Sequence, residues 1–241
     1  MSARIRIVLV DTTHPGNVGA SARAMKNMGL ASLVLVRPAA DPDGEAIARA
    51  AGAADVLEAA RIATSVDEAI GDCGLLLGTT ARERSANFRV LDARAGAAEI
   101  AASSRRGPVA VLFGGERNGL ANEELERCDA LLRIPSDPGY GSLNLAQAVQ
   151  VVCYEIRMAL AAGGQDCADE PPPATADERL ALDAHLERVM RASGFMHEGN
   201  AEQLAARVRR LFARARPDAG EVRILRGWLA AIERRLPPAE S

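Results

Sequence analysis

The chain has 241 residues, of which 48% are hydrophobic and 3% aromatic, and its formal net charge is −3. This length and apolar share suit one large domain, or one domain with a small appendage, and a core of that size needs no metal ion or disulfide to hold it. The slightly acidic balance argues against a protein that holds nucleic acid by bulk charge alone. No apolar run approaches the roughly 20 residues that span a bilayer, so we expect no membrane segment.

The cysteines and the N-terminal residues indicate a cellular compartment. Cys73, Cys128, Cys153 and Cys167 lack the close C-x-x-C spacing of a zinc or redox site. We expect reduced thiols, three of them buried, as is typical of a cytoplasmic protein. The first residues, MSARIRIVLVD, hold only a short apolar run before Asp11, which predicts a strand and not a signal peptide.

Short runs rich in Val, Ile and Leu alternate with helical stretches over the first 160 or so residues. Apolar runs without polar alternation are typical of parallel strands that are covered on both faces. The predicted strands are Ile5–Val10, Ser32–Val36, Leu75–Thr79 and Val109–Gly114, and a further strand ends at Pro135. The predicted helices are Asn17–Met28, Asp43–Ala51, Ser65–Ile70, Ala95–Ser104 and Asn122–Arg127, then a long one from about Ser142 to Ala162. This alternation predicts an open α/β domain with a parallel sheet over residues 1–163.

A proline-rich acidic segment follows this domain. Residues 164–176 hold three consecutive prolines and three acidic residues without a basic one, which predicts a linker, semi-rigid at Pro171–Pro173. Residues 177–241 predict a small all-helical extension, with helices at about Asp177–Ala192, Ala201–Ala215 and Gly220–Arg235. Twelve basic residues, all Arg, outnumber ten acidic ones there. That weak excess is compatible with RNA binding and does not establish it.

The first segment that suits chemistry is DTTHPGNVGASARAMK, from Asp11 to Lys26, directly after the first predicted strand. Its glycines lie before a helix, where backbone N–H groups can meet a phosphate. Asn17 suits the N-cap of that helix, and Arg23 projects from it. Taken alone, these residues also fit a turn, a cap and a solvated arginine. The spacing is not G-x-G-x-x-G, so no dinucleotide fingerprint is supported.

The second segment is VAVLFGGERNGLANEE, from Val109 to Glu124. Gly114 and Gly115 allow a sharp exit from a buried strand and a close approach of a ligand to the backbone. Glu116 interrupts this glycine turn and is hard to explain by structure alone. Leu120 stands where a P-loop needs Lys, which argues against a nucleotide triphosphatase.

The third segment is LLRIPSDPGYGSLNLAQ, in which a strand ends, a loop follows and a long helix begins. Ser142 suits the N-cap of that helix. Ser142 and Asn144 would also present a hydroxyl and an amide to a ligand at the helix N-terminus. Both interpretations stay open from these residues alone.

Taken in order, the three segments resemble the three motifs of the SPOUT methyltransferases. The matching stretches are HPGNVGASARAMKNMG at 14–29, LFGGERNGL at 112–120, and RIP followed by SLNLAQAV within 133–149. The similarity to the TrmJ-type branch of that family continues through GTTARER at 78–84 and into the tail, at GFMHEG, RRLFARARP and ILRG. Nearly the whole chain is covered, and the linker is the least similar part.

The resemblance implies a SPOUT-type parallel sheet with a deep trefoil knot in its C-terminal portion. It also implies S-adenosyl-L-methionine bound by the knot loops, a homodimer in which Arg23 of one subunit acts in the site of the other, and no metal ion. On the matching positions, the cofactor residues are Thr79, Thr80, Ala81, Gly114, Ile134, Gly141, Ser142 and Leu143. The catalytic residues that it implies are Arg23, Ser142, Asn17 and Glu116.

The activity that the resemblance implies is 2′-O-methylation of a cytidine or uridine at position 32 in the tRNA anticodon loop. A guanidinium has a pKa above about 12 and rarely serves as a base. We therefore expect Arg23 to grip a phosphate and stabilise the developing alkoxide, although in the family this arginine is sometimes given the base role. We further expect Ser142 to orient the ribose, Asn17 the arginine, and Glu116 the knot loops.

The tail holds a run of arginines with no acidic residue among them: Arg207, Arg209, Arg210, Arg214 and Arg216. They predict either a solvated helix face or an arm that binds tRNA through its phosphates. Two other functions stay open, namely methylation of another tRNA position or of ribosomal RNA, and RNA binding by a knotted protein without catalysis. The presence of Arg23, Glu116, Ser142 and Asn144 together argues against the non-catalytic protein.

Overall fold

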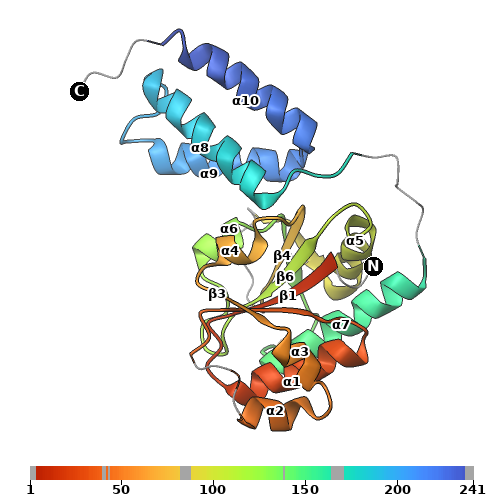
Figure 1. The fold of residues 1–241 in the computed structure, drawn as a ribbon. Coiled ribbons are helices and arrows are strands. Elements are labelled where there is room, and N and C mark those ends of the chain that lie inside the picture. Colours follow the sequence, from red (N-terminus) through yellow and green to blue (C-terminus); the bar gives the residue numbers. More distant parts are fainter. Residues whose placement is uncertain are drawn as a thin grey trace. The chain divides into compact units, whose positions relative to one another are not determined.

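The computed structural model describes residues 4–39, 42, 44–81, 88–137, 139–163 and 171–236, in two compact units, Met1–Glu170 and Pro171–Ser241 (Figure 1). The first unit contains a sheet of seven strands in the order β3-β2-β1-β6-β4-β7-β5, and every pairing between them is parallel. The strands are β1 Ile5–Val10, β2 Ser32–Val36, β3 Arg61–Ala63, β4 Leu75–Thr79, β5 Val90–Asp92, β6 Val109–Phe113 and β7 Ala130–Arg133. The prediction of a parallel α/β sheet is confirmed.

Helices cover both faces of this sheet because alternate residues of its buried strands point to opposite sides. One core joins Ile7 of β1 and Leu77 of β4 to five helices: α1 Pro15–Asn27, α2 Gly44–Ala50, α3 Ala54–Glu58, α5 Ala93–Ser103 and α7 Leu145–Ala161. The helix α6 (Asn122–Glu126) lies on the opposite face, where its Leu125 approaches Gly78 of β4. A short helix, α4, spans Val66–Ile70. Burying one large aliphatic side chain in such a core stabilises the fold by roughly 1.5–3 kcal/mol.

The start of α1 differs from the prediction. Pro15 is the first helical residue, where its fixed φ suits the helix and its missing N–H has no intrahelical partner to lose. The N-cap is His14, whose side chain makes no capping hydrogen bond. The prediction that Asn17 caps this helix is therefore wrong, and the Asn17 amide makes a tertiary contact instead.

The start of α7 also differs from the prediction. Asn144 is its N-cap, and the Oδ1 atom of Asn144 accepts a hydrogen bond from the Ala146 N–H at 2.9 Å. The prediction that Ser142 caps this helix is wrong. Ser142 and Leu143 belong to the loop before the helix, where both are exposed.

The described part of the second unit contains three helices, α8 Ala176–Ala192, α9 Ala201–Ala215 and α10 Ala219–Glu233 (cyan to blue in Figure 1). They enclose a small core of Ala174, Leu182, Val189, Val222 and Leu229. Thr175 and Asp218 begin α8 and α10 with reciprocal capping boxes, which favours these helix starts. Arg188 of α8 binds Glu233 of α10, with 2.6 Å between Nε and Oε1. The three predicted tail helices are present.

Some expectations fall on other parts of the chain. Residues 164–170 of the predicted linker, with Cys167, lie outside the described residues, and the domain boundaries and the trefoil knot stay predictions. Cys73, Cys128 and Cys153 are buried thiols outside any disulfide, as predicted. Within the described ranges, no helix combines the length and apolarity needed to cross a bilayer. Nor does any group of His, Cys, Asp and Glu there have the arrangement of a metal site.

Candidate functional site

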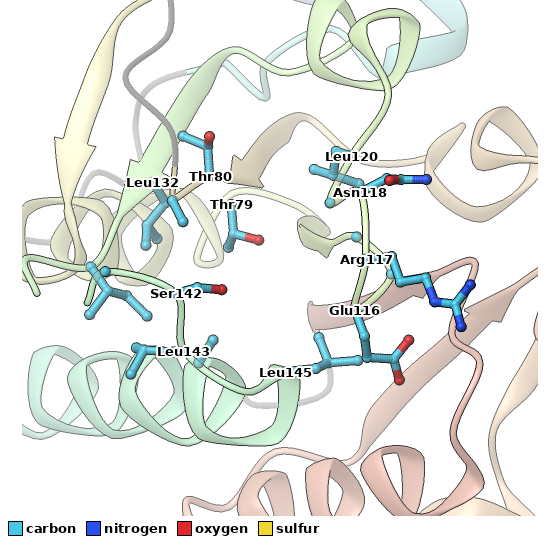
Figure 2. Close-up of a pocket in the computed structure, with 17 residues that line it drawn as sticks. Thr79, Thr80, Glu116, Arg117, Asn118, Leu120, Leu132, Ser142, Leu143 and Leu145 are labelled. Atoms are coloured by element: carbon cyan, nitrogen blue, oxygen red, sulfur yellow. The ribbon is translucent and has the colours of Figure 1, made fainter. Parts of the chain in front are cut away.

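A cavity lies at the carboxyl ends of β4, β6 and β7, the edge at which open parallel sheets bind ligands (Figure 2). Its volume of about 190 Å³ is more than ten times the space that one water molecule needs, so a small organic molecule can enter. The loops after these three strands and the start of α7 form its walls. The lining residues are 79–81, 114–120, Leu132, Ile134, 141–143, Leu145 and Ala148.

The eight residues that the resemblance assigns to the cofactor all line this one cavity. Glu116 and Ser142 of the implied catalytic set lie there too, whereas Asn17 and Arg23 do not. The Ser142 hydroxyl points toward the open space in Figure 2. Folding thus brings together three loops that are far apart in the sequence.

Hydrogen bonds between neighbouring strands fix the walls of the cavity. The Thr79 hydroxyl donates to the Leu112 carbonyl at 3.0 Å, which ties the end of β4 to β6. The Thr80 N–H donates to the Leu132 carbonyl at 3.0 Å, which ties the same loop to β7. The loop after β4 is therefore held on both sides where it meets the cavity.

The loop between β6 and α6 packs directly against the end of β1. A Cβ atom on Gly115 would lie 2.4 Å from the Asp11 carbonyl oxygen, so this close approach requires glycine. Gly119 has φ +68° and donates its N–H to the Gly115 carbonyl at 2.9 Å, which closes the turn. The glycines that stood out in the sequence thus shape the loop that carries Glu116.

The Glu116 carboxylate collects donors from the first segment. Its Oε2 atom accepts hydrogen bonds from the Thr13 N–H at 3.0 Å and from the Thr13 hydroxyl at 2.9 Å. Its Oε1 atom accepts from Asn17 Nδ2 at 2.8 Å and from the His14 N–H at 3.3 Å. In Figure 2 the carboxylate points away from the middle of the cavity. Glu116 therefore clamps the β6–α6 loop to the start of α1.

These contacts also decide the charge of Glu116. Partial burial acts to raise the pKa of the carboxyl, but the hydrogen bonds from Asn17 and Thr13 outweigh burial and lower the pKa to about 2. The group is ionised at neutral pH and acts only as an acceptor. So weak a base is poorly matched to removing a proton from a ribose hydroxyl.

Asn17 joins all three segments of the sequence. Its Oδ1 atom accepts a hydrogen bond from Asn144 Nδ2 at 3.0 Å, while its own Nδ2 donates to Glu116. The start of α7, the start of α1 and the β6–α6 loop are thereby linked. The expected orientation of Arg23 by Asn17 is not among these contacts.

Arg23 projects from α1 as an exposed side chain. In the part of the chain that the structure describes, its guanidinium has neither a carboxylate partner nor a hydrogen-bond acceptor. Since it does not line the cavity of its own chain, it remains available to another molecule.

Several lining residues were not predicted. Arg117 and Asn118 lie inside the second segment, so their place in a glycine-rich loop was the signal that could have found them. Leu120, Leu132 and Leu145 form apolar walls, and no sequence signal separates them from ordinary core leucines.

The tail arginines do not form one uniform face. Arg207 and Arg214 are exposed and Arg210 is half-buried, and their spacing places all three on one side of α9. Arg209 lies on another side, with its Nε atom 3.7 Å from Asp183 Oδ2. Arg216 ends the helix in a left-handed conformation, with φ +51°.

Known proteins share this architecture along almost the whole chain. Residues 4–154 match the SpoU rRNA Methylase family, and residues 180–241 match the C-terminal domain of the tRNA methyltransferase TrmJ. The tRNA (cytidine/uridine-2′-O-)-methyltransferase TrmJ of Escherichia coli strain K12 is 47% identical over 239 residues, which cover 98% of this chain and 97% of that protein. The chain belongs to the TrmJ family.

Solved structures agree with this assignment. The crystal structure of TrmJ from Z. mobilis ZM4 matches this TrmJ-family chain with a TM-score of 0.84 and 35% identity, over 96% of this chain and 100% of that one. The SpoU methyltransferase AviRb from Streptomyces viridochromogenes, in complex with the cofactor AdoMet, matches with a TM-score of 0.54 and 24% identity, over 67% of this chain and 62% of that one. This second likeness shows the fold alone. The predicted family and the predicted fold class are confirmed.

Proposed function

We propose that this TrmJ-family chain is an S-adenosyl-L-methionine-dependent tRNA 2′-O-methyltransferase that acts in the cytoplasm. Its target is a cytidine or uridine at position 32 of the anticodon loop. The observation that carries the proposal is the convergence of three separated motifs around one cavity beside the Glu116 clamp. The printed name of the E. coli relative supports the class of reaction and of substrate.

The cavity fits the methyl donor. Leu120, Leu132 and Leu145 offer apolar walls that suit an adenine ring, while the loops 79–81 and 141–143 bring backbone polar groups to the same space. When bound, S-adenosyl-L-methionine supplies a methyl group that is already activated by its sulfonium. The task left to the protein is to position a ribose hydroxyl and to favour the loss of its proton.

We assign the residues different tasks in that step. Ser142, exposed beside the cavity, orients the ribose through its hydroxyl. Glu116 and Asn17 hold the loops and the helix starts and take no proton, because the Glu116 carboxylate is so weakly basic. Arg23 grips the adjacent phosphate and stabilises the alkoxide that develops as the hydroxyl proton passes to solvent water.

The exposed position of Arg23 supports a homodimer in which Arg23 serves the partner's cavity. α1 packs beside α7 in the same core, and α7 carries Tyr154 and Met158 on its outer side, each 49% exposed. Large apolar side chains on one exposed helix side are typical of a protein interface. We infer that the two copies meet at α1 and α7.

The decisive experiment is a product analysis. The purified chain is incubated with labelled S-adenosyl-L-methionine and bulk unmodified tRNA, and the methylated nucleoside is mapped by mass spectrometry. A 2′-O-methyl pyrimidine at position 32 supports the proposal. A product at another tRNA position would assign the chain to that methyltransferase activity, and a product formed only when unmodified ribosomal RNA replaces tRNA would assign it to ribosomal RNA. If the protein binds the cofactor and tRNA but forms no product, the result would support RNA binding without catalysis instead.

Replacement of Arg23 tests its assigned role. Arg23→Ala should retain cofactor binding by calorimetry while methyl transfer falls by orders of magnitude. Arg23→Lys keeps the charge but loses the planar fork, so it should recover only part of the rate. Weaker cofactor binding with unimpaired turnover at saturation would refute the assignment.

A further inference from the structure

The outer side of α10 carries two large apolar side chains that the second unit does not bury. Ile224 is 73% exposed and Trp228 is 60% exposed, and a spacing of four residues places them side by side on the helix. Val222 and Leu229 of the same helix are 2% and 3% exposed and supply its contribution to the core. The exposed pair is therefore not needed for packing within this unit.

The helix surface next to Trp228 carries small residues. Gly227 precedes it, and a Cβ atom there would meet nothing within 4 Å. Ala231, one helical turn further on, is the next residue on this side of the helix. On the flank formed by Gly227 and Ala231, the helix surface therefore leaves room for a planar group beside Trp228.

Two arginines lie at the C-terminal end of this side of α10, and one carboxylate, Glu221, lies at its N-terminal end, seven residues before Trp228. Arg235 follows Trp228 at a spacing of seven, and Arg234 borders this side about a quarter-turn away; both arginines are exposed. Among the described residues neither arginine has an acidic partner. The acids of α10 are engaged within the unit: Glu221 accepts the Asp218 N–H at 2.8 Å, and Glu233 binds Arg188.

We propose that the Trp228 face (Ile224, Trp228, Arg234 and Arg235) binds an unpaired stretch of the RNA substrate. The indole stacks on a base, and the two arginines hold the adjacent phosphates. Aromatic rings take part in RNA recognition by stacking on bases that are splayed out of a helix, and arginine pairs well with phosphate. The inference rests on the proposed function in that it takes tRNA as the substrate.

The charges favour RNA over a second copy of the chain as the occupant. In a symmetric contact between two copies, residue i of one copy meets residue j of the other, so Arg234 and Arg235 gain only where they meet a carboxylate of the other copy. The acids of α10 already hold partners within the unit, which leaves the two arginines without a dedicated carboxylate in such a contact. An anionic ligand instead gains from every arginine on the face.

The chain contains a single Trp, so its fluorescence reports on this face directly. The full-length protein is titrated with unmodified tRNA transcript while Trp emission and the anisotropy of end-labelled tRNA are recorded together. Stacking should quench the emission in parallel with the binding curve. Emission that stays constant while anisotropy shows saturation would overturn the proposal.

Substitutions test the energetic share of the stacking interaction. Trp228→Ala should weaken tRNA binding about fivefold to a hundredfold, as expected for the loss of one stacked base. Trp228→Phe, which keeps an aromatic face, should retain most of the affinity. Phe195→Ala, which removes an aromatic side chain of similar exposure (64%) outside the face, serves as the matched control and should change little.

The outcomes of these experiments distinguish a failure of this inference from a failure of the proposed function. If the unaltered protein neither binds nor methylates tRNA, the proposed function fails. If the unaltered protein methylates tRNA and Trp228→Ala binds tRNA equally tightly, the role proposed for the Trp228 face is refuted and the proposed function stands. A change of oligomeric state in Trp228→Ala without loss of tRNA affinity would assign the face to an interface between copies and would also overturn the proposal.

Discussion

Glu116 gathers four hydrogen-bond donors from one short stretch of backbone and side chain, and this explains an acidic residue inside a glycine turn. The donors come from Thr13, His14 and Asn17, and each favours the ionised carboxylate. The neutral amide of Gln cannot replace it, since its NH2 group would face donors instead of acceptors. The same hydrogen bonds thus keep Glu116 ionised and hold the β6–α6 loop in place.

We expect Glu116→Gln to lower the free energy of unfolding by about 1–3 kcal/mol at neutral pH, because it leaves donors without an acceptor. The pKa of Glu116, about 2, lies below the ordinary glutamate value of about 4.3, so this stabilisation is complete above about pH 5. It should disappear as the pH falls from there toward 2. Urea unfolding followed by circular dichroism from pH 3 to pH 8 measures the difference.

A matched variant is Glu123→Gln, which neutralises an exposed acid on the neighbouring helix α6. It should lower the free energy of unfolding far less, and with little pH dependence. A Glu116→Gln deficit that persists unchanged at pH 3 would contradict the role given to the charge.

Residue roles could be predicted only in part from the sequence. The motif residues Gly114, Glu116 and Ser142 were singled out, and all of them line the cavity. The sequence predicts Asn17 and Ser142 as helix caps, because both residue types suit that position. Pro15 and Asn144 in fact decide where the helices begin. Such a competition between neighbouring candidates is settled by tertiary interactions, such as the hydrogen bond from Asn144 to Asn17.

At the scale of elements, the β6–α6 loop shows why two glycines of one turn are not equivalent. Gly115 is glycine because of the Asp11 carbonyl beside it, whereas Gly119 is glycine because of its positive φ. The first constraint is a clash with backbone that cannot move alone. The second constraint is the backbone strain that any other residue would have at the positive φ of Gly119, where there is open space for a side chain.

Gly115→Ala should therefore lower the free energy of unfolding by about 3 kcal/mol and weaken cofactor binding, since the loop must shift away from β1. Gly119→Ala should cost about 1 kcal/mol, the strain of one left-handed residue. Thermal unfolding and cofactor titration calorimetry compare the two variants. Equal effects of the two substitutions would show that the closeness of Asp11 does not limit the loop.

The strands that are buried on both faces were predictable, and the short edge strands were not. β1, β2 and β4 begin and end where their apolar runs do. β3 and β5 have three residues each, with exposed Ile62 and Val90, so they become strands only because a neighbouring strand offers a partner. A run that short has no periodicity to detect.

The described part of the molecule forms two units, each with a hydrophobic core of its own. The cavity belongs to the α/β unit, while the run of tail arginines belongs to the helical unit. Cofactor binding and RNA affinity should therefore respond to different substitutions.

The three arginines on one side of α9 allow a test of whether RNA affinity and cofactor binding depend on different units. Replacing Arg207, Arg210 and Arg214 together by Ala should weaken tRNA binding and reduce the slope of log affinity against log salt by about two to three, close to one for each phosphate that is no longer bound. Cofactor affinity should not change. Arg191→Ala is the control, because Arg191 already binds Glu187 at 2.7 Å. An unchanged salt slope in the triple variant would show that these arginines do not bind the phosphates of tRNA.

The proposed exchange of Arg23 between subunits has a consequence that no single variant shows. Arg23→Ala leaves a good cavity without its arginine, and Ser142→Trp should fill the cavity while leaving Arg23 in place. Each protein alone should be nearly inactive. When the two are unfolded together and refolded as an equal mixture, half of the dimers are mixed, and one of the two sites in each mixed dimer is intact.

The refolded mixture should regain about a quarter of the unaltered methyl-transfer rate, since pairing of subunits is random and closed. Refolding each variant separately and then combining them without subunit exchange is the control, and it should stay inactive. If Arg23 instead serves the cavity of its own chain, no mixed dimer holds an intact site, and the mixture should be as inactive as its components. The measured fraction therefore decides between action within one chain and action across the interface.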